Sequence, residues 1–257
     1  ATAGQAQGAL RQVAKHEDPE GGFVKAMEFK HRLRICNAYP HSTPLDVYRG
    51  GARLAGAGSL SYKACADFIT PLKAGDKLEF KVGDATAGTF SISDLPNNDA
   101  VLFLVIHRHD PLSTAVSFES HVFANLMNAQ IAIIDTYKGK SKAIPRIVDA
   151  EGANKRMRRE ELRFGSVVAV NPGRYEVELD DVHGETKMKH DLVAVNRESY
   201  VILRTGVEAQ QGPSFPQELV IFPQSNLTAL HSATVALAPS SFLIASIMGL
   251  AGLTWQR

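Results

Sequence analysis

The stretch LRICNAY, residues 33–39, decides the fold because it recurs as IAIIDTY at residues 131–137, an offset of 98. The block NNDAVLFL at 97–104 lines up in the same way with NRESYVIL at 196–203, at an offset of 99. The pair VF at 122–123 matches IF at 221–222, again at 99. A near-constant offset over separate blocks indicates a tandem repeat of roughly 95–100 residues.

Each copy of the repeat has the pattern of β structure. Apolar and charged residues alternate in LEFKV (78–82) and YEVEL (175–179), which is the period of half-buried strands. The continuous apolar runs at 101–106 and 200–203 predict central strands that are buried on both faces. Gly75 and Gly173 precede the alternating strands, and we expect them in equivalent turns. The sequence therefore predicts a mainly β fold of two tandem immunoglobulin-size β-sandwiches.

Composition and patterning divide the chain into four parts. We expect an N-terminal arm at 1–31, β-sandwich repeats at 32–127 and 128–227, and a C-terminal transmembrane anchor at 232–257. Helix is expected only at 8–15, in a short turn at 157–162 and in the anchor. A chain of 257 residues is long enough for two modest cores plus an anchor. A net charge of +1 gives no electrostatic case for nucleic acid.

The anchor is expected from TVALAPSSFLIASIMGLAGLT, residues 234–254. No Asp, Glu, Lys or Arg occurs between Glu218 and Arg257, and roughly 20 apolar residues cross a bilayer. Trp255 and Arg257 follow the run, where an interfacial ring and a snorkelling cation belong. Two alternatives remain, namely a buried C-terminal helix and a lipid-anchor signal starting near Ser232.

Small residues form a stripe within the expected anchor. Ser241, Ala245 and Gly249 follow one another at four-residue spacing, and Gly252 lies close by. Such a stripe lets the backbones of two membrane helices approach closely, although it also arises by chance in a segment rich in small residues. We expect this stripe to contact membrane-protein subunits or lipid of the bilayer.

The N-terminal region suggests a partner surface and a compartment. Phe23 and Phe29 lie in a polar arm that is too poor in apolar residues to form a core, so we expect both rings to bind along a partner. The Ala-Thr-Ala start predicts removal of a signal or transit peptide, with the folded bulk on the lumenal or extracytoplasmic side. Cys36 and Cys65 form either a disulfide in an oxidising compartment or two buried thiols.

Candidate reactive residues are few. Alternation places His107 and His109 on one face as a possible metal pair, but a third ligand such as His121 must come from elsewhere, and a solvated strand end is the alternative. There is no G-x-S-x-G elbow and no phosphate-binding glycine loop. We therefore expect no catalytic residues, no metal site and no intrinsic cofactor.

Two basic clusters occupy the second copy, KGKSK at 138–142 and KRMRR at 155–159. Glu160 and Glu161 follow the second cluster, as expected for a solvated loop and helix face. The functional alternative is an electrostatic dock for an acidic partner protein or for anionic lipid heads.

Part of the first repeat resembles a known family. RICNAYP (34–40), DVY (46–48) and the alternating strand after LKAG (72–75) look like a secreted β-sandwich family of unknown function, whose opening strands read R-x-x-N/H-A-x-P followed by D-V-Y. That pattern is similar to the alginate-acetylation accessory protein AlgF, which also pairs two small β domains. The resemblance covers about residues 32–126, and the second copy departs from it, with Asp135 where Asn37 stands and no D-V-Y.

These features together predict a non-catalytic, single-pass subunit of a multi-subunit membrane complex. The most concrete version is an accessory lumenal subunit of a photosynthetic photosystem–antenna supercomplex in the thylakoid membrane. In that case His231, near the membrane boundary, is a possible pigment ligand, and an interfacial histidine is the alternative. The rival interpretation, suggested by the AlgF-like resemblance, is a periplasmic or cell-surface module for polysaccharide modification or adhesion. A small esterase is a third.

Overall fold

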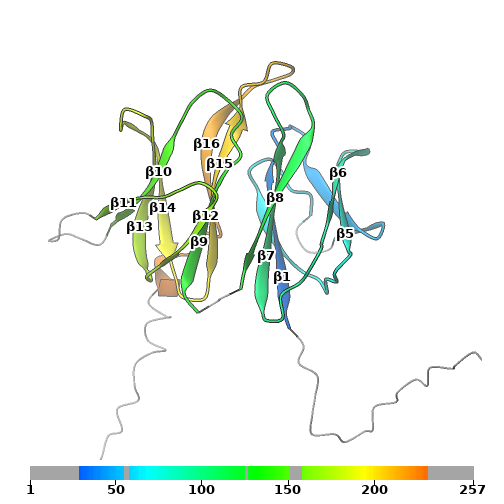
Figure 1. Ribbon diagram of the computed structural model, residues 1–257, viewed down its shortest axis with the longest axis horizontal. Coiled ribbons are helices and arrows are strands. Elements are labelled where there is room, and N and C mark those ends of the chain that lie inside the picture. Colours follow the sequence, from blue (N-terminus) through cyan, green and yellow to red (C-terminus); the bar gives the residue numbers. More distant parts are fainter. Residues whose placement is uncertain (1–28, 55–57, 125–126, 151–157, 231–257) are drawn as a thin grey trace, which may run out of the picture.

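Sixteen strands form four stacked sheets in the described part of the chain. The computed structural model describes residues 29–54, 58–124, 127–150 and 158–230. Each sheet has four strands, and the four sheets lie side by side as layers in Figure 1.

The first repeat forms a sandwich of two sheets with the strand orders β4-β1-β7-β8 and β3-β2-β5-β6. Its strands are β1 (His31–Ala38), β2 (Leu45–Arg49), β3 (Ala52–Arg53), β4 (Cys65–Ile69), β5 (Lys77–Val82), β6 (Ala85–Ser91), β7 (Ala100–Arg108) and β8 (Val116–Phe123).

The second repeat forms a sandwich with the orders β12-β9-β15-β16 and β11-β10-β13-β14. Its strands are β9 (Ala129–Asp135), β10 (Ile144–Asp149), β11 (Arg159–Glu161), β12 (Ser166–Val170), β13 (Gly173–Asp180), β14 (Thr186–Ala194), β15 (Ser199–Val207) and β16 (Phe215–Phe222).

The two sandwiches have the same topology, which confirms the tandem repeat. Adding eight to each strand number of the first repeat gives the order of the second in both of its sheets. At the centre of each repeat lies a parallel pair, β1 with β7 and β9 with β15, and every other pairing between the described strands is antiparallel. The alternating segments 78–82 and 175–179 lie in β5 and β13, as the sequence predicts.

One turn is built alike in both repeats despite a sequence difference. The Tyr39 N–H donates to Oδ1 of Asn37 at 2.9 Å, and the Tyr137 N–H donates to Oδ1 of Asp135 at 3.0 Å. The turn needs only a side-chain oxygen two residues earlier, and both residue types supply one. The change from asparagine to aspartate therefore leaves the fold of the second copy intact.

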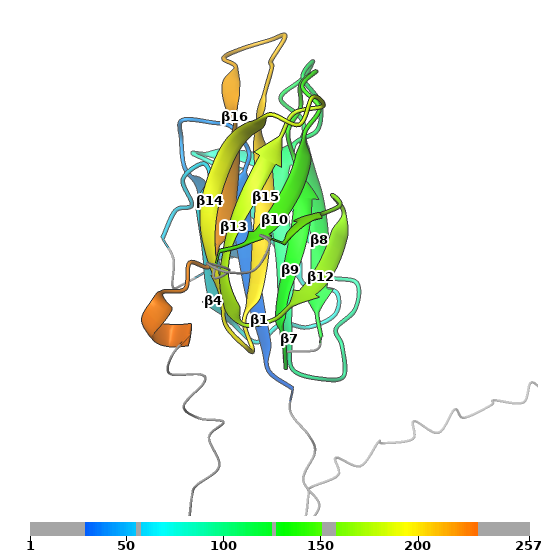
Figure 2. The same cartoon turned by 90° about the vertical axis from the view of Figure 1, so that its left-hand side faces the viewer.

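Each sandwich has its own apolar core, and a third core joins the sandwiches. In the sheets β4-β1-β7-β8 and β12-β9-β15-β16, the faces turned away from their own sandwich cores pack on each other. We call this contact the seam. It buries Cys36, Ala38, Val101, Phe103, Val105, Phe123, Ala132, Ile134, Val201 and Leu203. The two sheets that form the seam are the central layers in Figure 1, and Figure 2 shows one sandwich in front of the other.

The seam explains the continuous apolar runs. All nine residues of β7 and all nine of β15 are buried. In β7, Leu102 and Leu104 point into the first sandwich core, whereas Val101 and Phe103 belong to the seam. Successive side chains of a strand point to opposite faces, so a strand covered on both sides has to be apolar throughout. The prediction of central strands buried on both faces is confirmed.

Two local predictions are wrong. Residues 159–161 form the strand β11, which pairs with β10, and not a helical turn. Gly75 has a φ of +87° in a turn where its N–H donates to the Ile92 carbonyl, whereas Gly173 is the first residue of β13 and pairs with Ala194. Only the first glycine therefore occupies a left-handed turn, because the second already belongs to the ladder.

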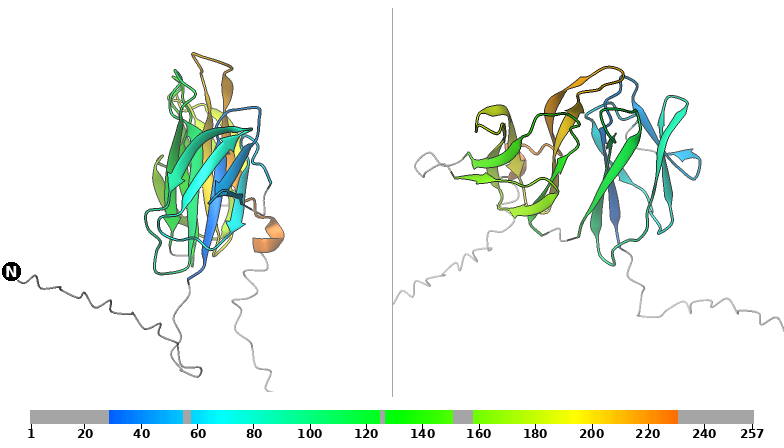
Figure 3. Two further views of the ribbon diagram at one scale, coloured as in Figure 1. Left: turned by 90° about the vertical axis from the view of Figure 1, so that its right-hand side faces the viewer. Right: turned by 45° about the horizontal axis from the view of Figure 1, so that its top comes forward.

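The chain leaves the described fold twice at the same end. The strands β1, β7, β9 and β15 all begin at what we call the lower end, at the bottom of Figure 1, and the short helix at 227–230 lies towards that end as well (Figure 3). The opposite end is the upper end. Within the described ranges no helix is long and apolar enough to cross a membrane; the expected anchor at 232–257 and the expected helix at 8–15 lie outside those ranges.

Candidate functional site

A buried arginine holds the polar part of the seam. The Arg34 side chain has no exposed surface, and its Nε and Nη2 donate to the Asp67 carboxylate at 2.7 and 2.8 Å. Nη2 also lies 3.1 Å from Oε1 of Glu198, and Nη1 donates to the Ser199 carbonyl in the second sandwich. The guanidinium carbon sits 5.0 Å from the centre of the Phe222 ring. One side chain from β1 thus ties together both repeats.

The charge of Arg34 is stabilised in place. Burial by itself lowers the pKa of this guanidinium, but the hydrogen bonds and charges of Asp67 and Glu198 outweigh burial and raise it. A permanently charged, fully bonded arginine of this kind fixes register and orientation and does not serve as an acid or base. We assign Arg34 a structural role at the seam.

Further polar contacts cross the seam towards the upper end. The Tyr62 hydroxyl lies 3.2 Å from Oγ1 of Thr205, and the Lys63 ammonium lies 2.7 Å from Glu218. The Gln210 N–H donates to the Pro111 carbonyl at 2.8 Å. Contacts at both ends of an apolar core resist rotation of one sandwich on the other. The double sandwich is therefore one rigid body.

Cys36 and Cys65 form a disulfide beside the seam. They lie directly opposite one another on β1 and β4, and their Cα atoms are 4.0 Å apart. The structure thus selects the disulfide over the alternative of two buried thiols. Disulfides persist in oxidising compartments, so this bond is the structural observation that bears on the compartment of the protein.

The two histidines considered as a metal pair lie in different environments, one buried and one near solvent. His107 is buried on β7, its Nδ1 donates to the Arg108 carbonyl at 2.9 Å, and its Nε2 lies 3.5 Å from Oε1 of Glu119. His109 lies past the end of β7 near solvent, with Nδ1 2.7 Å from Oγ of Ser117. Within the described residues, no group of three His, Cys, Asp or Glu side chains is placed to hold a metal ion.

The contact between His109 and Ser117 has the residue types of a nucleophile and its base. A working pair also needs a third group that orients the imidazole. The neighbouring Asp110 does not serve as that group, because one of its carboxylate oxygens accepts from the N–H groups of Leu112 and Ser113 within the turn. The arrangement is therefore a capped hairpin, and it does not support acyl transfer.

The buried imidazole of His107 makes stability depend on pH. Burial lowers the pKa of His107 below its ordinary 6.5, with Lys138 and His109 acting in the same direction. The unfolded chain then binds more protons than the folded one, so the free energy of unfolding should fall as pH falls through about 6.5. We expect the denaturation midpoint to drop between about pH 8 and pH 6, and to drop less in His107→Gln.

Two other groups on β8 also have shifted pKa values and therefore contribute to the same pH profile. Burial also lowers the pKa of His121, so the double variant His107→Gln/His121→Gln should flatten the pH profile further. Burial raises the pKa of Glu119 above 4.5, which changes stability with the opposite sign at lower pH. A profile of His107→Gln that runs parallel to that of the wild type would contradict the assignment.

The second basic cluster is partly neutralised by the fold. Arg159 lies on β11 and contacts Glu178 at 2.6 Å and Asp180 at 2.7 Å, both on β13. Arg146 and Lys189 contact the same two acids, Arg146 reaching Asp180 at 2.8 Å and Lys189 reaching Glu178 at 2.8 Å. The charge of Arg159 is therefore balanced by acidic side chains of the same sheet. Residues 155–157 of the second cluster lie outside the described residues.

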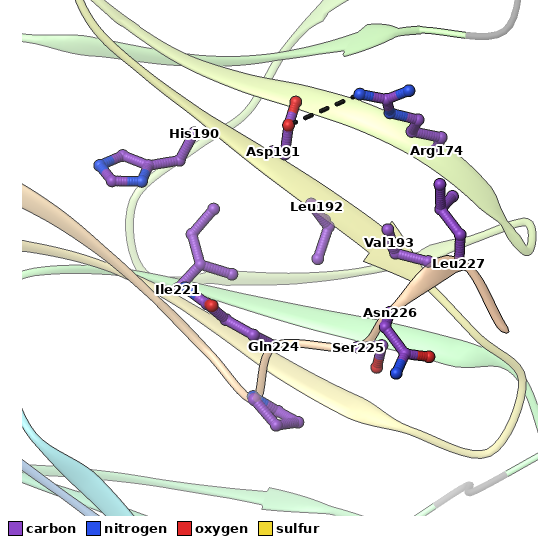
Figure 4. A pocket seen from close by; sticks show the side chains of 11 residues that line it. Arg174, His190, Asp191, Leu192, Val193, Ile221, Gln224, Ser225, Asn226 and Leu227 are labelled. Carbon is purple, nitrogen blue, oxygen red and sulfur yellow. Dashed lines mark ion pairs between the residues drawn. The ribbon is translucent and has the colours of Figure 1, made fainter. Parts of the chain in front are cut away.

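A polar groove lies beside the lower end. It has a volume of about 390 Å³ and lies between β14 and the segment 223–227 (Figure 4). Arg174 and Asp191 form an ion pair of 3.6 Å on its rim, and Ser225 accepts from or donates to the Tyr200 hydroxyl at 2.7 Å. A second hollow of about 500 Å³ shares His190, Ile221 and Gln224 with it and extends past Cys65.

Besides His190 and the Arg174–Asp191 pair, the groove presents hydrogen-bond donors and acceptors. Its one serine, Ser225, is bonded to Tyr200, which in turn accepts the Val195 N–H at 3.1 Å. The arrangement fits a polar segment of a partner better than a reacting substrate. Sequence reasoning missed this groove because its residues come from β13, β14, β16 and the following segment, none of which shows a motif.

Most of the interaction residues predicted from the sequence lie outside the described residues. Phe29 is half-buried just before β1, at the lower end. Phe23, Ser241, Ala245, Gly249 and Gly252 lie outside the described residues, as does His231. Their roles stay predictions.

Comparison with known proteins finds distant likeness in structure alone. No family model matches the chain, and no curated protein matches it in sequence. The crystal structure of CBMbc (family CBM26) from Eubacterium rectale Amy13K in complex with maltoheptaose aligns over 77% of this chain and 99% of that chain, with 11% identity and a TM-score of 0.25. At that score the likeness carries no argument about ligand or function. The fold defines the class as a tandem β-sandwich protein whose two sandwiches pack along the seam.

Proposed function

We propose that this protein is a non-catalytic structural subunit of a membrane assembly. Residues 232–257 hold it in the bilayer, and the double sandwich stands in an oxidising, extracytoplasmic or lumenal compartment. The observation that carries the proposal is the seam, which makes one rigid body of two domains with an apolar core, the buried Arg34 and a disulfide at its edge.

The chemistry of the described surface supports binding more than catalysis. Arg34 is saturated by its partners, His109 lacks an orienting acid, and the groove at Arg174 presents a charged rim and hydrogen-bonding groups. Rigid β-sandwiches commonly present loops and strand edges to partners, so this architecture is suited to binding. The polar groove is then one place for a partner segment.

The most specific form of the proposal is a photosynthetic supercomplex in the thylakoid membrane, and it depends on the sequence alone. The AlgF-like resemblance supports the rival, a periplasmic or cell-surface module for polysaccharide modification, and the disulfide suits both. Purification on a native gel with mass spectrometry of the partners separates the two. A chlorophyll-containing complex favours the first form, and a polysaccharide-acetylating machine favours the second.

Membrane attachment is tested by comparing the full chain with a chain ending at residue 231. We expect the full chain to stay with membranes through an alkaline carbonate wash and the shortened chain to be released as a folded protein. The described strands and the seam use no residue beyond 222. The shortened chain should therefore have the same β circular dichroism and the same cooperative melting as the full chain.

The same comparison contains the result that would reject the anchor. If the chain ending at residue 231 unfolds or aggregates, the tail is a core helix and the membrane assignment is wrong. Gly249→Leu is the matched variant within the full chain. We expect it to keep membrane attachment but to weaken retention in the assembly, because a bulky residue in a small-residue stripe separates closely packed helices.

A further inference from the structure

The lower end of the double sandwich carries most of the exposed large apolar side chains of the described residues. Ile69 is 93% exposed at the end of β4, and Met127 is 64% exposed in the connection from β8 to β9. Leu227 is 44% exposed beside the groove, and Val122 is 41% exposed one residue before the end of β8. At the upper end the exposed members of this set are Leu112 and Val182, and Val167 lies along the side.

We propose that the lower end rests on the bilayer surface, with Ile69, Met127 and Leu227 at the level of the lipid headgroups. This inference rests on the proposed function, which places residues 234–254 in the membrane, and it adds the orientation of the double sandwich. Apolar side chains grouped around the point where a membrane segment begins are expected at an interface, because partial immersion removes them from water.

The short length of chain between the fold and the expected membrane segment supports this orientation. As a membrane helix, the 21 residues from 234 to 254 would be about 32 Å long, and the hydrocarbon core is about 30 Å thick. The apolar run is therefore used up in crossing, and it has to enter the bilayer near residue 234. Only residues 231–233 separate that point from the helix at 227–230, and three residues span about 10 Å at most.

The chain before β1 joins the fold at the same lower end. Phe29 is half-buried immediately before β1, whose first residue His31 lies at the lower end and pairs with Ala100. The predicted arm, with Phe23, therefore starts where aromatic rings are favoured at a membrane interface. Phe29 and Leu227, which lie next to the two chain exits, are therefore at the same end of the fold.

The charges of the lower end indicate a neutral lipid surface. At this end Arg49 lies 3.5 Å from Asp76 and Arg32 lies 3.4 Å from Glu198, so basic and acidic groups are interspersed. A mixed charge gives little attraction to anionic headgroups. We therefore expect the contact to form on phosphatidylcholine and to change little when anionic lipid is added.

The test places one fluorescent label at each end of the protein in lipid vesicles. The full chain carries a single added cysteine as Ile69→Cys or Met127→Cys at the lower end, and as Leu112→Cys or Val182→Cys at the upper end. Cys36 and Cys65 are bonded to each other, so they do not compete for the label. Each variant is reconstituted into phosphatidylcholine vesicles that contain a nitroxide-headgroup quencher.

We expect the lower-end labels to be quenched at least about threefold more than the upper-end labels, because a nine-residue strand such as β7 separates the two ends by roughly 30 Å. Equal quenching of all four labels on protein that floats with the vesicles would overturn the orientation and leave the anchor standing. Stronger quenching at the upper end would do the same. A full chain that fails to float would reject the proposed function, and the orientation would fall with it.

Discussion

Replacing Arg34 by methionine is expected to lower the free energy of unfolding by about 3 kcal/mol. The methionine fills part of the buried volume but leaves Asp67 and Glu198 without their shared cation, and the link to Ser199 across the seam is lost. The loss lies at the low end for a buried ion pair because the two carboxylate side chains keep 26% and 23% of their surface exposed.

Arg32 supplies the matched control for that measurement. It contacts the same two acids, Asp67 at 3.3 Å and Glu198 at 3.4 Å, but its side chain is 34% exposed. Arg32→Met should therefore cost at most about 1 kcal/mol. Urea titrations compare the two variants directly, and Arg34→Met should also melt roughly 6–12 °C below the wild type. Equal losses for the two variants would contradict the structural role of Arg34.

Replacing both Cys36 and Cys65 by alanine is expected to cost about 3–4 kcal/mol. The bond closes a loop with a sequence separation of 29, and opening it lets the unfolded chain gain the corresponding freedom. Both side chains pack at the seam, with Cys36 fully buried, so the smaller alanines also lose contacts there.

Reduction of the wild type gives an independent measurement of the same bond. Unfolding in the presence of dithiothreitol should lower the wild-type midpoint towards that of the double variant, and it should leave the double variant itself unchanged. A wild-type midpoint that is insensitive to reductant would mean that Cys36 and Cys65 are not bonded.

The repeat could be predicted from the sequence because each copy carries the same local patterns. The apolar runs in β7 and β15 and the alternation in β5 and β13 follow from which face of a strand meets a core, and that is recorded residue by residue. The turns after β1 and β9 survive the change from Asn37 to Asp135 because both side chains provide the same acceptor.

The candidate site could not be predicted to the same extent. The groove at Arg174 and Asp191 is lined by segments that are distant in sequence and carry no motif. The histidine pattern at 107–109 correctly places the residues at a strand end, but only the fold separates the buried His107 from the solvent-facing His109. The predicted interaction residues of the arm and anchor, apart from Phe29, lie outside the described residues.

The sequence by itself determined the number of β units, the positions of their central strands and the expectation of a membrane segment, because periodicity and long apolar runs are local properties. The tertiary structure decided what covers the second face of β7 and β15, the bonding of Cys36 to Cys65 and the pairing of Arg34 with Asp67 and Glu198. Those features join residues as distant in sequence as Arg34 and Glu198, which are 164 positions apart, and such contacts exist only once both sandwiches have formed and stacked. A burial pattern can show that a face is covered, but the partner that covers it is set by the packing of the whole chain.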